Sequence, residues 1–205
     1  MRVKRDIALR RAPGNPREGR LALAHGVRRA ALGRSGVAAL KREGDGTTPL
    51  GRFPIRQVLY RADRVMRPRT QFPIHAIGAS DGWCEDPTDR NYNKMVRLSP
   101  RASADRLTRA DHLYDLVLVL GFNDRPRVRG RGSAIFVHLA RPGYAPTAGC
   151  IASRGTICCC SLHSCGVVLR SVYFRRVGKA KRAHRLCTWA SARADAYPTE
   201  TRRLW

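Results

Sequence analysis

Alternation of apolar and polar positions is the main pattern along the first three quarters of the chain, and it predicts short β-strands. Residues 116–121 differ, because they form an unbroken apolar, β-branched run that indicates a central strand. A turn is expected at 13–16, where Pro-Gly-Asn-Pro interrupts the pattern. The expected strands are 3–10, 20–27, 52–60, 116–121 and 133–139.

Two polar segments separate these strands. Residues 41–51 read Lys-Arg-Glu-Gly-Asp-Gly-Thr-Thr-Pro-Leu-Gly, a turn-rich loop that Lys41, Asp45 and Thr48 are expected to shape. Residues 61–94 form a long polar stretch, and long loops in compact domains are usually functional or disordered. Its Trp83 and other aromatic residues favour order.

The pattern changes after Ile151. Residues 152–205 show no sustained period of 2 or 3.6, and they hold five of the seven cysteines. We therefore predict a catalytic-type domain over 1–151, followed by a basic, Cys-rich, irregular tail over 152–205. The tail could bind nucleic acid or a partner through the cluster at 179–185. A change of reading frame in a GC-rich gene would also produce such a peptide, and we favour that interpretation.

The large net charge adds little to the predicted function. The 205 residues carry a formal net charge of +25, which is compatible with binding to phosphate or to an anionic wall polymer. Nearly all basic residues are Arg and they are scattered, as GC-rich codons alone would produce. We expect no specific nucleic-acid partner. No apolar run reaches the roughly 20 residues of a membrane helix, and no apolar signal core follows Met1–Arg20.

The spacing of the cysteines and of the acidic residues does not match known metal-binding motifs. No C-x-x-C pair faces a second pair, and the odd number of cysteines does not indicate a disulfide framework. Glu85, Asp86 and Asp89 lack the spacing of an EF-hand loop. We therefore expect no metal site.

Candidate chemistry lies in two neighbouring segments. On the strand at 133–139, alternation places Ala134, Phe136 and His138 on one face. Twelve positions later, a turn through Gly149 presents Cys150. A thiol needs a nearby base to become nucleophilic at neutral pH, and His138 could serve. The Gly149 and Cys150 amides could form an oxyanion hole. The alternative is an inert buried cysteine beside a structural histidine.

The same residues carry a family resemblance. The block from Lys41 to Phe53 contains Gly-Asp…Thr-Pro-x-Gly-x-Phe, and Ile135-Phe-Val-His138 is followed by Thr147-Ala-Gly149-Cys150-Ile151. With these two blocks, residues 1–151 resemble the L,D-transpeptidase catalytic domain, the YkuD-like family. Three positions depart from the family pattern, and they bear on substrate contacts more than on the Cys-His pair: Leu139, Ala148 and Ala152.

This resemblance implies a mostly β fold, a sandwich or mixed sheet with short helices and a cleft. It implies that Cys150 attacks a peptidoglycan stem peptide to form a thioester, with His138 as general base. The product would be an L,D-type peptide crosslink in a bacterial cell wall, or a protein attached to the wall, with effects on wall organisation and cell shape. The resemblance implies no metal and no organic cofactor. The family implies a periplasmic or cell-envelope location, while a cytoplasmic one stays open, as does the oligomeric state.

Four further residues are expected to contact substrate at the cleft rim: Trp83, Tyr92, Asn93 and Tyr144. The alternative for the loop around Trp83 is a turn held by Asp and Asn side chains. For 111–115, which contains His112 and Tyr114, we favour a structural role. Two other functions stay open for the whole chain: a basic polyanion-binding module with a structural cysteine, and an inactive, truncated or frameshifted transpeptidase relative.

Overall fold

Strands make up most of the ordered structure. A computed structural model describes residues 7–23, 26–98, 104–154 and 171–174. Within these residues the one helical element is a 3-10 turn, η1 (Pro142–Tyr144). The strands are β1 (Ile7–Ala12), β2 (Asn15–Leu23), β3 (Gly26–Ala31), β4 (Val37–Ala38), β5 (Thr48–Pro49), β6 (Arg52–Tyr60), β7 (Ile74–Ala76), β8 (Asp81–Cys84), β9 (Lys94–Arg97), β10 (Asp105–Arg106), β11 (Leu116–Leu120), β12 (Phe136–Leu139), β13 (Ile151–Ser153) and β14 (Ser171–Phe174).

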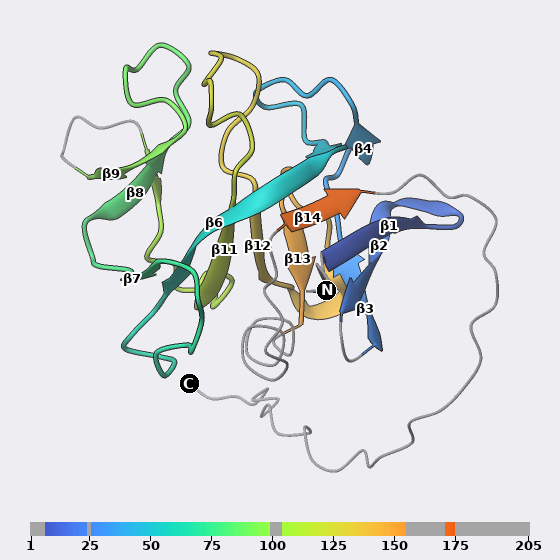
Figure 1. Ribbon diagram of the computed structural model, residues 1–205, viewed down its shortest axis with the longest axis horizontal. Coiled ribbons are helices and arrows are strands. Elements are labelled where there is room, and N and C mark those ends of the chain that lie inside the picture. Colours follow the sequence, from blue (N-terminus) through green and yellow to red (C-terminus); the bar gives the residue numbers. More distant parts are fainter. Residues whose placement is uncertain (1–6, 24–25, 99–103, 155–170, 175–205) are drawn as a thin grey trace, which may run out of the picture.

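The largest sheet is mixed and closes on itself. Its strand order is β11-β12-β13-β3-β2-β1-β14-β6-β7, and β11 also pairs with β6, which closes a ring with β7 attached to β6. In Figure 1 the long β6 crosses beside β11, with β1–β3 on the opposite side. Smaller sheets, β10-β8-β9 and β4-β5, lie outside this ring of pairings. The expectation of a mostly β, mixed-sheet fold is confirmed.

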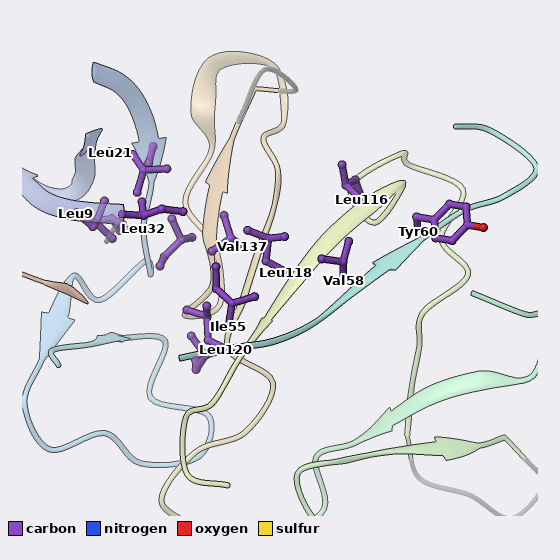
Figure 2. Close-up of a cluster of buried hydrophobic side chains, with 14 residues drawn as sticks. Leu9, Leu21, Leu32, Ile55, Val58, Tyr60, Leu116, Leu118, Leu120 and Val137 are labelled. Atoms are coloured by element: carbon purple, nitrogen blue, oxygen red, sulfur yellow. The ribbon is translucent and has the colours of Figure 1, made fainter. Parts of the chain in front are cut away.

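The main hydrophobic core is built from alternate residues of the closed sheet. On β6, Val58 and Tyr60 belong to this core, while Leu59 belongs to a second cluster. On β11, Leu118 faces the main core, and its neighbours face the second cluster. Figure 2 shows side chains from the two sides of the ring meeting in one layer. This core therefore fills the space that the closed sheet surrounds.

The second cluster lies on the other face of β6, β11 and β12. There Phe136 packs edge-on against Trp83 of β8, with ring centroids 5.0 Å apart. Leu107, which follows β10, is also fully buried in this cluster. Cys150 packs against its edge. The small β8–β9–β10 sheet thus covers the face on which the candidate nucleophile lies.

The strand predictions hold best where the pattern is strongest. The strand predicted at 52–60 is confirmed residue for residue as β6, and the run at 116–121 forms β11, buried on both faces. At 133–139 the pairing begins only at Phe136, because Ala134 has a positive φ of 51°. The predicted alternation is nevertheless confirmed, since Ala134 and Phe136 face one cluster and Ile135 faces the other.

The N-terminal prediction is shifted rather than wrong. The expected strand at 20–27 is divided between β2 and β3, and β2 begins already at Asn15. Gly14, with φ of 77°, makes the tight turn between β1 and β2. In the long stretch 61–94, two short strands form, β7 and β8, and the rest consists of turns and loops.

Only a small part of the predicted tail falls within the described residues. Residues 152–153 continue β13 in the main sheet, and β14 lies between β1 and β6 in that sheet. Residues 155–170 and 175–205 lie outside the described residues, and so does the cluster at 179–185. The division of the chain at 151 stays a prediction. No helix in the described part of the chain is long and apolar enough to span a membrane.

Candidate active site

Cys150 lies at the entry to β13, directly beside the strand that carries His138. Strands β12 and β13 are parallel, with Val137 opposite Ile151. The Cys150 thiol donates to the Ala134 carbonyl at 3.1 Å and accepts from the Phe136 N–H at 3.4 Å. The nucleophile is therefore half-buried and held against the backbone of the preceding segment.

His138 lies on the same face, further along the strands. It is opposite Ala152, so Cys150 precedes its partner by two positions, an offset of roughly 7 Å along the strands. The structure brings both residues to one face, but no hydrogen bond joins their side chains among the described residues. Such contacts often tighten only when substrate binds.

The imidazole of His138 is oriented by its own neighbour. Its Nδ1 lies 2.8 Å from the Leu139 carbonyl oxygen, which can only accept a hydrogen bond. Nδ1 therefore carries the proton, and Nε2 is free to take one from a thiol. The Tyr114 ring packs edge-on against the imidazole, with centroids 5.3 Å apart, and fixes its plane further.

Burial keeps both members of the pair neutral at rest. It lowers the pKa of His138 to about 4, and the hydrogen bond to Leu139 opposes this shift only in part. Burial also raises the pKa of the Cys150 thiol to about 12, against the opposing effect of the Phe136 N–H. At neutral pH the structure holds a thiol beside a neutral imidazole, rather than a preformed ion pair.

Gly149 allows the loop at 41–51 to reach the nucleophile. Its φ is 142°, a region that favours glycine. A Cβ at this position would lie 2.8 Å from the Thr47 carbonyl oxygen, a contact that side chains do not tolerate. The Gly149 N–H already donates to the Thr147 hydroxyl at 3.1 Å. The Cys150 amide is therefore the better of the two predicted oxyanion donors, and that role stays a prediction.

The loop itself is organised around Asp45. Its carboxylate accepts from the Lys41 ammonium and the Thr47 N–H through one oxygen, at 2.7 and 2.8 Å. Its other oxygen accepts from the Arg42 N–H and the Thr47 hydroxyl, at 2.7 and 2.9 Å. Burial opposes ionisation, but these hydrogen bonds hold the pKa of Asp45 at about 2. Thr48 anchors the loop by accepting the Gly33 N–H at 2.8 Å.

Three of the four residues predicted to contact substrate lie in the interior. Trp83 donates its indole N–H to Asn93 at 3.1 Å. Asn93 also accepts from the Ala134 N–H and donates to two backbone carbonyls, so all its hydrogen-bonding capacity is used. Tyr92 is 3% exposed and donates to Glu43. Their burial supports a framework role below the site, and direct substrate contact by them stays a prediction.

Tyr144 is the accessible member of that set. It lies on η1 with a φ of 61° and lines a groove of about 490 Å³ with Pro16 and Pro146. The Arg29 guanidinium lies 4.7 Å from the centre of its ring, a cation–π contact. A role in substrate binding is compatible with this position and stays a prediction.

Sequence inspection missed the charged groups around the thiol. Lys41 was expected only to shape a turn, and Tyr114 only to serve structure. Burial, reinforced by Asp105 and Glu43, raises the pKa of Glu85 to about 7, while Lys41 opposes the shift. The sequence offers no signal for this grouping, because its members come from separate loops. Within the described residues, no group of His, Cys, Asp and Glu is arranged to hold a metal ion.

Comparison with known proteins agrees with this geometry. The family model for the L,D-transpeptidase catalytic domain, YkuD, matches residues 16–155, about two thirds of the chain and including both His138 and Cys150. No curated protein and no solved structure gives a significant match to the chain. The family match covers well over half of the sequence, so the chain belongs to the L,D-transpeptidase catalytic domain family.

Proposed function

We propose that this protein is a cysteine-dependent L,D-transpeptidase that forms peptidoglycan crosslinks, with Cys150 as nucleophile and His138 as general base. One observation carries the proposal. The two residues that the family motif selects lie on one face of adjoining strands, and Nε2 of the imidazole has no hydrogen-bond partner among the described residues. Acyl transfer needs this combination of a thiol and an unprotonated base.

The reaction divides into two acyl transfers. In the first, Nε2 of His138 takes the thiol proton as Cys150 attacks a carbonyl of the donor stem peptide. The C–N bond then breaks, the leaving amine takes the proton from His138, and a thioester on Cys150 remains. In the second, His138 removes a proton from the acceptor amine, which attacks the thioester. The peptide bond forms, and the proton returns to the Cys150 sulfur.

The resting geometry implies a change before the first step. The thiol hydrogen bond to the Ala134 carbonyl must break for the proton to reach His138. Rotation about the Cys150 Cα–Cβ bond accomplishes this without moving the backbone. The Cys150 amide then supports the oxyanion of the tetrahedral intermediate.

The same proposal gives the substrates of the protein and its cellular location. The substrates are peptidoglycan stem peptides, and the protein works at the cell envelope. The net charge of +25 supports this, because a basic protein concentrates near anionic wall polymers. Tyr144 and its groove are the accessible surface that we expect to meet the wall first.

The proposal predicts a covalent adduct on Cys150. The protein is incubated with a carbapenem or with a tetrapeptide stem, digested with trypsin, and analysed by mass spectrometry. The peptide 132–154 is ideal for this, because Cys150 is its only cysteine. We expect a stoichiometric adduct on that peptide.

Two variants make the test specific. Cys150→Ala removes the thiol and should abolish the adduct. Cys84→Ala should retain it, because Cys84 is buried in β8 and is not part of the Cys150–His138 pair. A folded protein that forms no adduct on Cys150 with either reagent contradicts the proposal.

A second candidate function rests on an arginine row. Arg10, Arg20 and Arg29 are exposed and lie opposite one another across β1, β2 and β3. Arg29 is already paired with the Glu18 carboxylate of β2, whereas Arg10 and Arg20 lie directly opposite each other. Like charges in that position destabilise a sheet, and a bound polyanion would offset their repulsion. Binding to a polyanion whose affinity falls steeply with salt, in a protein without a Cys150 adduct, would favour this function.

A further inference from the structure

Lys41 is a buried ammonium that the two-residue mechanism does not use. The residue is 5% exposed, and a charged side chain is costly to bury unless it is paired. Its Nζ donates to Asp45 at 2.7 Å and contacts the Arg42 carbonyl at 3.4 Å. An ammonium has three donors, and the third has no partner among the described residues.

Two glycines allow this side chain to reach Gly149, the residue before the nucleophile. A Cβ at Gly132, where φ is 96°, would lie 3.0–3.1 Å from the Lys41 methylene carbons. A Cβ at Gly149 would lie 3.4 Å from Nζ itself. The side chain therefore runs between positions that only glycine suits, and its charge lies against the residue that precedes Cys150.

The other charged groups around the thiol do not favour its ionisation. Glu85 and Asp105 both raise the pKa of Cys150, and His138 is neutral because of its burial. Tyr114 also faces this region, and its phenol is kept protonated by burial. Lys41 is the cation whose field opposes these effects. Removing water strengthens such an interaction, because the local dielectric constant falls.

We propose that Lys41 is a positioning residue. Its ammonium holds a fixed positive charge against Gly149, and this charge stabilises the Cys150 thiolate once His138 has taken the thiol proton. Asp45 holds the ammonium in place and partly neutralises it. This inference rests on the proposed function for its choice of nucleophile, but it does not depend on the substrate. It also explains why the Lys41–Asp45 pair and Gly132 and Gly149 occur together.

The alternative is that Lys41 only ties down the loop. Two variants separate these roles, because both break the Lys41–Asp45 ion pair but change the local charge in opposite directions. Lys41→Met removes the positive charge and retains much of the side-chain length. Asp45→Asn removes the negative partner and leaves the ammonium uncompensated. A purely structural role predicts that both variants alter thiol reactivity in the same direction.

The readout is the rate at which iodoacetamide alkylates Cys150, followed from pH 6 to 11 on the tryptic peptide 132–154. An opposite charge within about 4–6 Å shifts a pKa by about one unit or more. We therefore expect Lys41→Met to slow alkylation at least about tenfold below the thiol pKa and Asp45→Asn to accelerate it. Lys41→Arg should stay near the wild-type rate. Lys94→Met, on β9, is the matched control and should leave the rate unchanged.

Each outcome decides the inference. Opposite shifts in the two variants support it, while equal or parallel shifts overturn it. If Lys41→Met does not fold, as judged by circular dichroism, Asp45→Asn alone still tests the sign, and slower alkylation contradicts the inference. Carbapenem adducts are measured on the same samples. Opposite shifts without any adduct would refute the proposed function and leave the role of Lys41 standing.

Discussion

At the scale of single residues, the site depends on groups kept in unusual protonation states by burial. His138 is neutral because its ring is removed from water, and its proton is assigned to Nδ1 by the Leu139 carbonyl. Cys150 is a thiol for the same reason. Reactivity must therefore come from proton transfer during attack, assisted by nearby charge, rather than from a resting thiolate.

The lowered pKa of His138 predicts that the folded protein loses stability on acidification. In the unfolded chain the imidazole titrates near pH 6.5, and in the folded protein near pH 4. Between these values the unfolded state binds the extra proton, so acidification lowers the free energy of unfolding. The limiting slope for one proton is about 1.4 kcal/mol per pH unit.

Urea denaturation at several pH values between 4 and 7.5 measures this effect. The comparison is between wild type and His138→Gln, which cannot titrate in this range. We expect the variant to lose stability less steeply on acidification, while carboxylate contributions stay common to both proteins. Parallel stability curves for the two proteins would refute the assigned protonation of His138.

At the scale of elements, the nucleophile region is held by segments from other parts of the chain. Asn93, which directly precedes β9, is 4% exposed, and its side chain hydrogen-bonds four partners. Two of them are the Trp83 indole on β8 and the Ala134 N–H, which lies just before β12. This one amide side chain therefore fastens the small sheet to the strand that carries His138.

Removal of the Asn93 amide should lower the free energy of unfolding substantially. Asn93→Ala leaves buried donors and acceptors unsatisfied, each at about 1–3 kcal/mol, and places alanine at a φ of 56°. We expect a loss of roughly 3–5 kcal/mol in the free energy of unfolding, measured by urea denaturation. Asn91→Ala is the control, since within the described residues Asn91 is held by its backbone N–H and its side chain makes no hydrogen bond, so the loss should stay within about 0.5 kcal/mol. Similar losses in both variants would contradict this role.

The observed strands also show what the apolar–polar alternation of the sequence can and cannot predict. Alternation correctly assigned the two faces of 134–139, because side-chain direction in an extended chain has a period of two. It missed the late start of pairing at Phe136, since nothing in the sequence announces the positive φ of Ala134. It also missed strands of two to four residues, such as β8, which are too short to display a period.

At the scale of the whole molecule, closure of the large sheet is the decisive feature. The β6–β11 pairing closes the sheet into a ring, and residues from both sides of the ring share one core. Leu118 lies in that core on β11 and is fully buried. Its contacts therefore connect parts of the chain that are distant in sequence.

Truncation of Leu118 tests this core. Leu118→Ala should lower the free energy of unfolding by about 2–5 kcal/mol, through lost burial and the cavity left behind. Urea denaturation measures the loss against Leu40→Ala, whose side chain is 79% exposed and should matter little. An effect on Leu118→Ala below 1 kcal/mol would mean that the core does not hold the closed sheet together.

The sequence by itself determined the strand-rich class, the faces of the longer strands and the Cys150–His138 motif. Each depends on local periodicity or on residue types at short spacing. Only the tertiary structure decided that the sheet closes, that Trp83, Tyr92 and Asn93 lie inside, and that Lys41 reaches Gly149. These features depend on where the fold places groups that are far apart in the sequence, because charge and burial act through space rather than along the chain.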